Sequence, residues 1–426
     1  MNHSKRVEWS RLDNASKYFA ATYSEKDEKV FRLSCEFFEE VDPEILQQAL
    51  DETIERFPYY RSVLRRGIFW YYLENSDIHP LVEKEDKPVC APIYRKYERK
   101  LLFRVLYYNK RISIEVFHAL SDGTGALRFM MTLVYYYLLI KYRDEFSDQI
   151  PELSYNASIS EKKDDSFNRY YQGRHFKKQV KSKKEKKKSK KVYRLKGTRF
   201  EENRVKIIEG TMSAKAVLDE AHKYNTTMTV FLSAILLRSI YMDMPVRKKD
   251  YSLVLSVPIN LRQYFKSETA SNFFSTMNIE YNFGKGSMDL SEVIESLNES
   301  FRKELTEERL NEHLNWQMSI EKNLFARVLP LPLKNLFVRI ADEVVERRTT
   351  ACISNLGRIQ MPSQFDGYIR QFIVVPNVRR PQLAVCSYGD KMVVTFGSPF
   401  EETEVLKNFF KSLSEMGIKI EISSNM

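Results

Sequence analysis

The sequence predicts an α/β protein of two similar lobes, each a β-sheet covered by helices. Strand patterns and helix patterns alternate in both halves of the 426-residue chain, which is typical of sheets flanked by helices. A lysine-rich stretch of low complexity separates the halves. We therefore expect an N-terminal lobe over 1–150, a basic, mobile interlobe linker over 151–200 and a C-terminal lobe over 201–426.

The first elements of the N-terminal lobe are a strand and a helix. VFRLSCEFF, which begins at Val30, has the alternation and aromatic content of a strand. Asp42 followed by proline is a signal for an N-cap and a first helical turn. The helix that follows ends before Pro58, because the residue preceding a proline avoids the α region.

A hairpin and a buried helix complete this lobe. LLFRVLYY and ISIEVF flank a polar turn at 109–111 and read as two antiparallel strands, the second of which leads directly to His118. After the turn SDGTG, the apolar run 126–142 is too long for one strand and predicts a buried helix.

The basic linker carries the charge of the whole protein. Residues 174–199 hold fourteen Lys and Arg against one acid, Glu185, which exceeds the chain's net charge of +11. Clustered lysines attract any polyanion. We expect a solvated loop, with contact to an anionic membrane surface through 177–191 as the functional alternative. Aromatic residues are too few there to stack on bases, which argues against specific nucleic-acid binding.

The C-terminal half shows the same mixture of elements. Strands are predicted at NRVKII, YSLVLSVPINLR and FFSTMNIEY, near residues 351, 369, 383 and 393, and at the final IKIEI. Helices are predicted over 213–224 and 230–242 and from Glu401 to a stop at Gly417. One or two amphipathic helices are expected over 290–329, ended by Pro330 and Pro332.

The sequence lacks the motifs and spacings that are typical of several other protein classes. The four cysteines, Cys35, Cys90, Cys352 and Cys386, are dispersed, and no histidine has a partner at ligand spacing, so we expect a reducing compartment and no metal. The longest strongly apolar run, 129–140, is too short to span a bilayer, and we expect a soluble, cytoplasmic protein. The absence of GxGxxG, GxxxxGK[ST] and GxSxG argues against dinucleotide, P-loop and serine-hydrolase chemistry.

The segment FHALSDGTG is the candidate catalytic centre. It places His118, Asp122, Gly123 and Gly125 between the end of a strand and the start of a helix. Imidazole titrates close to neutral pH and can act as a general base, while glycines let other groups approach closely. The alternative is a strand-end histidine bonded to the backbone, followed by an ordinary turn.

The chain resembles the chloramphenicol acetyltransferase-like superfamily, which includes condensation domains and alcohol acetyltransferases. The shared motif is HxxxDG, here 118–123. ERFPYYRSVL at 55–64, SVPINLR at 256–262 and CISNLGRI at 352–359 are similar to further family segments in the expected order. The resemblance extends over residues 10–424 and is nearest the alcohol acetyltransferase branch.

The resemblance implies two pseudo-symmetric chloramphenicol acetyltransferase-like lobes with mixed sheets and an active-site tunnel between them. His118 would be the base of a direct acyl transfer without a covalent enzyme intermediate or a cofactor. Asp122 and Gly123 would support the active-site loop, with Arg61 as the partner of Asp122. The candidates for contact with the substrate or the oxyanion are Ser256, Asn260, Asn272, Ser354 and Asn355.

Two departures from related branches bear on the substrate. Phe117 stands where many condensation domains have a second histidine, and the DFGWG motif of plant acyltransferases is absent. We therefore expect a free acyl-CoA donor and an alcohol or amine acceptor. The alternatives are a carrier-protein-dependent condensation or acyl-transfer domain and a non-catalytic binding homologue.

Overall fold

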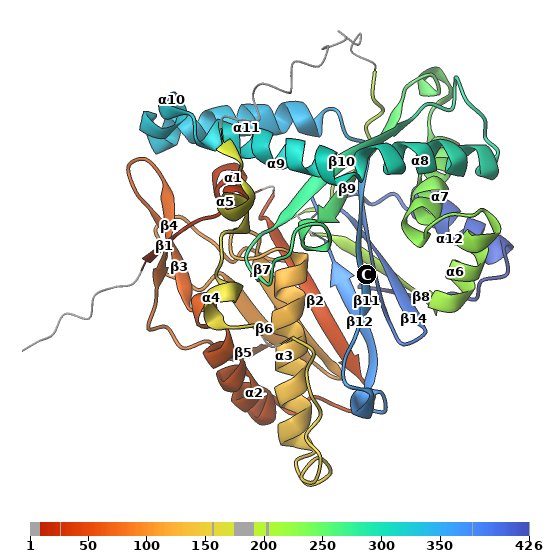
Figure 1. Ribbon diagram of the computed structural model, residues 1–426. Helices are drawn as coiled ribbons and strands as arrows, with labels where there is room; N and C mark the ends of the chain where they lie inside the picture. Colours follow the sequence, from red (N-terminus) through yellow and green to blue (C-terminus); the bar gives the residue numbers. More distant parts are fainter. Residues whose placement is uncertain are drawn as a thin grey trace, which may run out of the picture.

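The structure is a computed structural model that describes residues 9–25, 27–155, 157–173, 191–201, 204–376 and 378–425. Two large hydrophobic cores divide it into an N-terminal and a C-terminal lobe. Each core lies between a mixed β-sheet and its helices (Figure 1). The predicted α/β architecture of two lobes is confirmed.

The N-terminal lobe contains a five-stranded sheet with helices on one face. The strand order is β12 (Ile369–Val375), β2 (Val30–Phe37), β7 (Arg111–Phe117), β6 (Phe103–Tyr108) and β5 (Val82–Lys84). Helices α2 (Pro43–Arg56) and α3 (Gly123–Lys141) lie side by side on it (Figure 1). The Asp42 carboxylate caps α2 by accepting hydrogen bonds from two backbone N–H groups, as the sequence predicts.

Helix α3 is the predicted buried helix. Among the described helices, it alone is long and apolar enough to cross a membrane, and 56% of its most apolar window is buried inside the lobe. Such burial is typical of a core helix.

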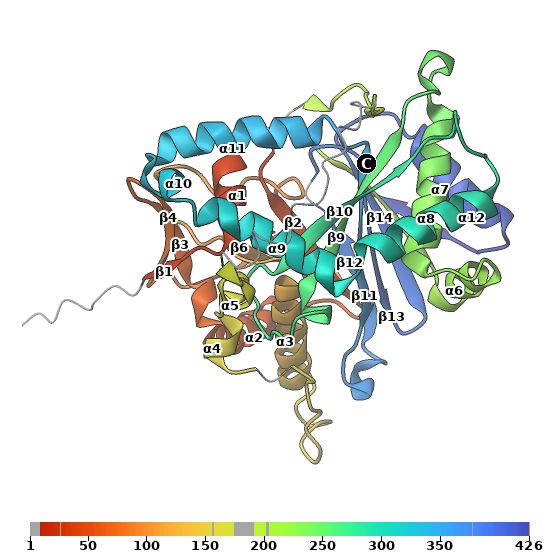
Figure 2. The same cartoon turned by 45° about the horizontal axis from the view of Figure 1, so that its top comes forward.

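The C-terminal lobe contains a seven-stranded sheet. Its order is β10 (Phe274–Tyr281), β9 (Leu253–Asn260), β11 (Ala351–Ile359), β13 (Gln382–Tyr388), β14 (Lys391–Ser398), β8 (Lys206–Ser213) and β15 (Glu421–Ser424). Strand β11 runs parallel to β9 and β13, whereas the other pairs are antiparallel. The outer face is covered by α6 (Ala214–Lys223), α7 (Met228–Asp243), α8 (Leu290–Glu304) and α12 (Glu404–Glu415) (Figure 2).

One strand from the C-terminal half belongs to the N-terminal sheet. Strand β12 pairs antiparallel with β2, and Phe372 lies opposite Cys35. Phe372 is 2% exposed and packs in the N-terminal core. The lobe expected over 201–426 is therefore not continuous in space, because 369–375 leaves it to complete the other sheet.

The segment around the prolines near residue 330 differs from expectation. Helix α9 (Glu307–Glu321) is followed by α10 (Leu324–Val328) and by a long helix α11 (Leu331–Glu346). Pro332 lies in the first turn of α11. A proline is tolerated there because the first N–H groups of a helix have no intrahelical acceptor. The helices expected over 290–329 do end before Pro330, with α10 stopping at Val328, but a new helix that was not expected begins at Leu331.

Other elements were not expected from the pattern. Helix α1 (Asn14–Thr22) precedes β2, and a small sheet combines β1 (Trp9–Arg11), β4 (Tyr71–Asn75) and β3 (Ser62–Arg66). The linker is folded in part into α4 (Ile159–Lys162) and α5 (Ser166–Tyr170), and Phe167 is buried in the C-terminal core. The basic tract 177–191 lies outside the described residues except at Lys191.

Strand β12, which comes from the C-terminal half and completes the N-terminal sheet, provides a test of this architecture. Phe372→Ala removes a buried ring from the N-terminal core and should lower the free energy of unfolding by about 3–5 kcal/mol. Tyr97→Ala, at a side chain that is 94% exposed, is the control and should change it by less than about 0.5 kcal/mol. Denaturant unfolding measures both; equal stability of the two variants would contradict the assignment of β12.

Candidate active site

The backbone of His118 is fixed by both lobes. It follows β7 directly, and its N–H donates to the carbonyl of Lys29 at 2.8 Å. Its own carbonyl accepts a hydrogen bond from Nδ2 of Asn272 at 3.0 Å, from the loop that precedes β10. The position of the imidazole therefore depends on how the lobes are joined.

Three aromatic rings surround the His118 imidazole. Phe19 of α1 stacks on it with ring centroids 4.0 Å apart and 16° between the planes. Phe31 of β2 and Phe274 of β10 lie at 4.7 and 5.9 Å. The side chain is partly exposed, whereas Nδ1 is buried and has no hydrogen-bond partner among the described residues. Because Nδ1 is buried, Nε2 is the ring nitrogen at which we expect a substrate to meet the imidazole.

Burial lowers the pKa of His118 from the ordinary 6.5 to about 4. The negative charge of Asp122, the Asn272 side chain and the carbonyl of His118 itself act in the opposite direction, but burial outweighs them. The cation of Lys29 lowers the pKa further. At neutral pH the imidazole is uncharged and can accept a proton.

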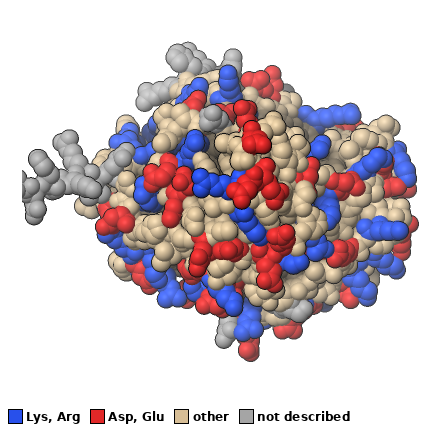
Figure 3. Space-filling view, turned by 90° about the horizontal axis from the view of Figure 1, so that it is seen from below, with Lys and Arg blue, Asp and Glu red and all other residues tan. Residues whose placement is uncertain are grey.

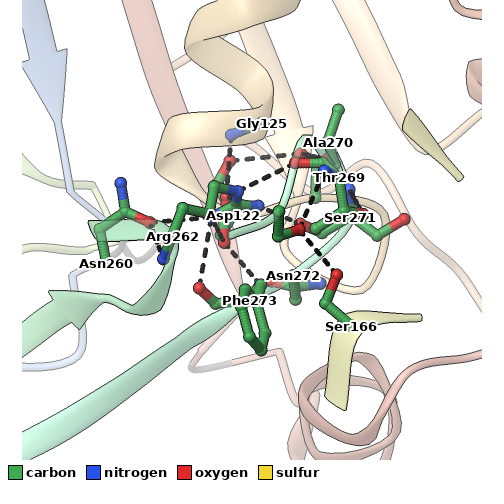
Figure 4. A network of polar contacts seen from close by, with 12 residues as sticks. Asp122, Gly125, Ser166, Asn260, Arg262, Thr269, Ala270, Ser271, Asn272 and Phe273 are labelled. Atoms are coloured by element: carbon green, nitrogen blue, oxygen red, sulfur yellow. Dashed lines mark hydrogen bonds and ion pairs between the residues drawn. The ribbon is translucent and has the colours of Figure 1, made fainter. Parts of the chain in front are cut away.

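Asp122 joins the lobes through a buried ion pair with Arg262 (Figure 4). Nη1 of Arg262 lies 2.9 Å from Oδ2 and Nη2 lies 3.2 Å from Oδ1, so the contact is bidentate. The same carboxylate caps α3 by accepting from the N–H of Gly125 and also accepts from the N–H of Phe273. These contacts direct it toward the protein, as expected of a structural residue rather than the acid of a catalytic triad.

The expectation that Arg61 pairs with Asp122 is wrong. Arg61 lies at the end of the short helix before β3, where its guanidinium faces Glu55 at 3.3 Å, and both side chains are substantially exposed. Arg262 takes the role instead because it follows β9, next to the loop that reaches across to α3. Arg262 stands in the SVPINLR segment, so the signal was present in the sequence.

The remaining donors of Arg262 organise the loop 269–273. They bind the carbonyls of Thr269 at 2.9 Å, Ser271 at 2.6 Å and Phe273 at 3.3 Å (Figure 4). A guanidinium with all these acceptors is held in one orientation. The loop that positions Asn272 against His118 is therefore shaped by the same arginine that binds Asp122.

Gly125, rather than Gly123, is the glycine that the contact between the lobes requires. A Cβ at Gly125 would lie 2.0 Å from the carbonyl oxygen of Ala270. A Cβ at Gly123 would lie 3.1 Å from a methyl group of Leu356, a flexible side chain that can adjust. The Ser121 hydroxyl donates to the Ala270 carbonyl at 2.6 Å, which closes the contact.

Two of the five candidate substrate residues already use their amide donors. Nδ2 of Asn272 donates to the carbonyl of His118 and to Oγ of Ser16. Nδ2 of Asn355 donates to Oγ1 of Thr229, and its Oδ1 accepts from the N–H of Gly357. These contacts make both asparagines supports of the backbone.

The other three candidates lie on the partly exposed face of the C-terminal sheet. Ser256 and Asn260 share one face of β9. In the neighbouring strand β11, Cys352 is paired with Ser256. Ser354 lies two residues after Cys352 and therefore on the same side of β11. Asn260 is paired with Phe274, whose ring contacts His118. Directly opposed residues of antiparallel strands share a face, so of these three residues Asn260 is the one nearest the imidazole by register.

The aromatic surroundings of His118 are not predicted by any sequence pattern. Phe19, Phe31 and Phe274 come from three distant segments, and no local pattern brings them together. Phe117, which stands in place of a second histidine, is fully buried and stacks with Tyr94 at 5.2 Å. No group of three His, Cys, Asp or Glu side chains that could hold a metal is found in the described part of the chain.

Comparisons with known proteins give one sequence family and one fold. Residues 109–373 match the sequence model of the alcohol acetyltransferase family. No curated protein with which the chain was compared matches it. Trichothecene 15-O-acetyltransferase from Fusarium sporotrichioides is similar in structure, with a TM-score of 0.61, 10% identity and coverage of 98% of this chain and 96% of that one.

Condensation domains share the same fold. The first condensation domain of the calcium-dependent antibiotic synthetase, in complex with a substrate analogue, gives a TM-score of 0.64 at 12% identity, covering 99% of this chain and 100% of that one. A variant of the starter condensation domain of rhizomide synthetase in complex with C8-CoA gives 0.61 at 11% identity, covering 96% and 94%. At these identities the likeness shows the fold of two lobes.

The buried pair makes a prediction about stability. Asp122→Asn and Arg262→Met should each lower the free energy of unfolding by about 3–5 kcal/mol, because each leaves a buried charge without its partner. Arg61→Met is the matched control and should cost less than about 1 kcal/mol, since its ion pair is exposed. In denaturant titrations, an Arg61 variant as unstable as the Arg262 variant would contradict the assignment.

Proposed function

We propose that this chain, which belongs to the alcohol acetyltransferase family, transfers an acyl group from acyl-CoA to the hydroxyl or amine of an acceptor. The observation that carries the proposal is the state of His118. Its imidazole is neutral at working pH, is packed between rings from both lobes, and has Nδ1 buried, which supports Nε2 as the atom that meets the substrate. These are the properties that a general base requires.

In the proposed reaction, Nε2 of His118 takes the proton of the acceptor hydroxyl while its oxygen attacks the thioester carbonyl. A tetrahedral intermediate with a negatively charged oxygen forms. When it collapses, the carbon–sulfur bond breaks and the thiolate of coenzyme A takes the proton back from the imidazolium. Burial disfavours the imidazolium and so favours this return of the proton. The acyl group passes directly between substrates.

Asn260 is the proposed donor to the negatively charged oxygen. Its Oδ1 accepts from the backbone N–H and the guanidinium of Arg262, which orients the amide. In Figure 4 the Nδ2 atom points away from this arginine. Its register opposite Phe274, whose ring contacts His118, supports a position on the face that meets the imidazole. A preoriented amide N–H is a suitable oxyanion donor.

Two features support the proposed pair of substrates, a hydroxyl acceptor and an acyl-CoA donor. Membership of the alcohol acetyltransferase family supports transfer to a hydroxyl group. The buried, stacked Phe117 gives this site no second histidine of the kind found in many condensation domains. A carrier-bound thioester is the alternative donor, and the assay below separates the two.

The direct test is release of free thiol from a panel of acyl-CoAs in the presence of mixed alcohols and amines. His118→Ala should lower the turnover of wild type by roughly 100- to 10,000-fold, because the general base is lost. His79→Ala, at an exposed histidine that pairs with Asp51 of α2, is the matched control and should retain wild-type turnover. Melting temperatures establish that the variants are folded.

The possible results separate the alternatives. If the enzyme uses the acyl group when a carrier protein holds it, but not when CoA holds it, the donor is a carrier-bound thioester. His118 would remain the proposed general base. Equal activity of wild type and His118→Ala would contradict the mechanism. A wild type that is inactive with both donors would favour a binding role.

The low pKa of His118 predicts the acid limb of the pH profile. The neutral imidazole is the active form, so kcat/KM should persist as the pH falls through 6.5 and decline only toward the pKa of about 4. The folded state binds fewer protons than the unfolded chain between these values, so acid also lowers stability in this window. After each measurement the enzyme is therefore returned to neutral pH, and recovery of its initial rate shows that acid has not unfolded it. A reversible acid limb centred near 6.5 would contradict the prediction.

A further inference from the structure

Helix α11 exposes an apolar stripe over most of its length. Leu333, Phe337, Ile340 and Val344 are 46–61% exposed and follow each other at intervals of three or four residues. Residues at this spacing lie on one side of a helix. In Figures 1 and 2 the helix forms the outer edge of the molecule, with α1 and α9 beneath it.

The turn between β3 and β4 extends this stripe. Ile68 and Trp70 at its tip are 75% and 49% exposed. The tip is fastened to the start of α11, because the N–H of Leu331 donates to the Ile68 carbonyl at 2.9 Å and Nζ of Lys334 donates to the Phe69 carbonyl at 2.8 Å. Together the six side chains of Ile68, Trp70, Leu333, Phe337, Ile340 and Val344 form one surface, the apolar face.

The charges beside the apolar face are positive. Residues 322–341, which span α10 and most of α11, contain four cations and no Asp or Glu, and the turn 65–71 contains two arginines and no acid. The three acids of α11 follow this region and are paired with cations: Asp342 is buried against Arg379, Glu343 contacts Arg347 and Arg379, and Glu346 pairs with Arg380. Figure 3 shows the face opposite α11, where both signs of charge are interspersed.

The apolar face and the positive charges beside it together indicate which kind of partner can cover it. A second copy of the chain would set the same cations against each other and is disfavoured. An anionic bilayer surface offers a hydrocarbon boundary for the apolar side chains and negative headgroups for the lysines and arginines that flank them. An exposed helix with an apolar stripe and basic flanks is typical of a segment that lies in the plane of a membrane surface.

We propose that the apolar face docks the protein on an anionic lipid surface, with α11 parallel to the bilayer and the β3–β4 turn inserted into it. Helix α11 connects the docked face to the candidate active site through α1. Arg339 donates to the carbonyl of Ala21 at 2.9 Å, which holds α11 on α1, and Phe19 of α1 stacks on His118. One helix separates the docked face from the imidazole.

Sedimentation with vesicles tests the proposal without reading activity. Wild type should sediment with phosphatidylcholine vesicles containing phosphatidylglycerol, and less with phosphatidylcholine alone or at high salt. The double variant Phe337→Ser, Ile340→Ser should bind at least about tenfold more weakly, given the burial energy of each apolar side chain. Met242→Ser, Val246→Ser, at exposed apolar residues of the C-terminal lobe, is the matched control and should bind as wild type.

Fluorescence locates the inserted turn. The chain has three tryptophans, at 9, 70 and 316. With Trp9→Phe and Trp316→Phe in place, brominated lipids should quench Trp70 on vesicle binding.

Three results would overturn the proposal. The first is a wild type that does not sediment with anionic vesicles. The second is binding that is lost on deletion of 177–191 but kept in Phe337→Ser, Ile340→Ser, which would assign it to the basic tract. The third is a wild-type dimer that the double variant converts to monomer, which would make the face an interface between copies.

Discussion

The ion pair between Asp122 and Arg262 is the interaction on which the rest of the site depends. It is buried and bidentate, and it joins the first turn of α3 in one lobe to the segment after β9 in the other. Burying two charges is costly unless their other hydrogen-bonding capacity is used. Here the carboxylate also accepts two backbone N–H groups and the guanidinium also binds three carbonyls, so the pair specifies one arrangement of the lobes.

That arrangement determines the properties of His118. Asn272, in the loop shaped by Arg262, holds the backbone of His118, and Phe274, at the start of the next strand, covers one side of its ring. Phe19 covers another side from the N-terminal lobe. The low pKa of the imidazole thus results from a pocket to which both halves of the chain contribute. Separation of the lobes would expose the ring and return its pKa toward the ordinary value.

Local patterns predicted much of the fold and the central residue. The hairpin of β6 and β7, the helices α2 and α3 and the HxxxDG segment were all foreseen, because alternation, an N-cap followed by proline and a long apolar run each act over a few residues. The sequence predicts Arg61 as the partner of Asp122, but Arg262, in another segment that resembles the family, takes this place, and only the tertiary structure shows it. Helix α11 was missed because Pro332 can start a helix as well as end one. The aromatic rings around His118 meet only through the fold.

Nuclear magnetic resonance of the imidazole groups measures the central claim most directly. The chain has six histidines, and comparison with His118→Ala assigns the signal of His118 in a pH titration. In the folded protein this signal should titrate near pH 4, well below the ordinary 6.5. The Arg262→Met protein, if folded, should show a value shifted toward 6.5. A wild-type His118 that titrates near 6.5 would contradict the account, because the imidazole would then not lie in the closed, aromatic site described here.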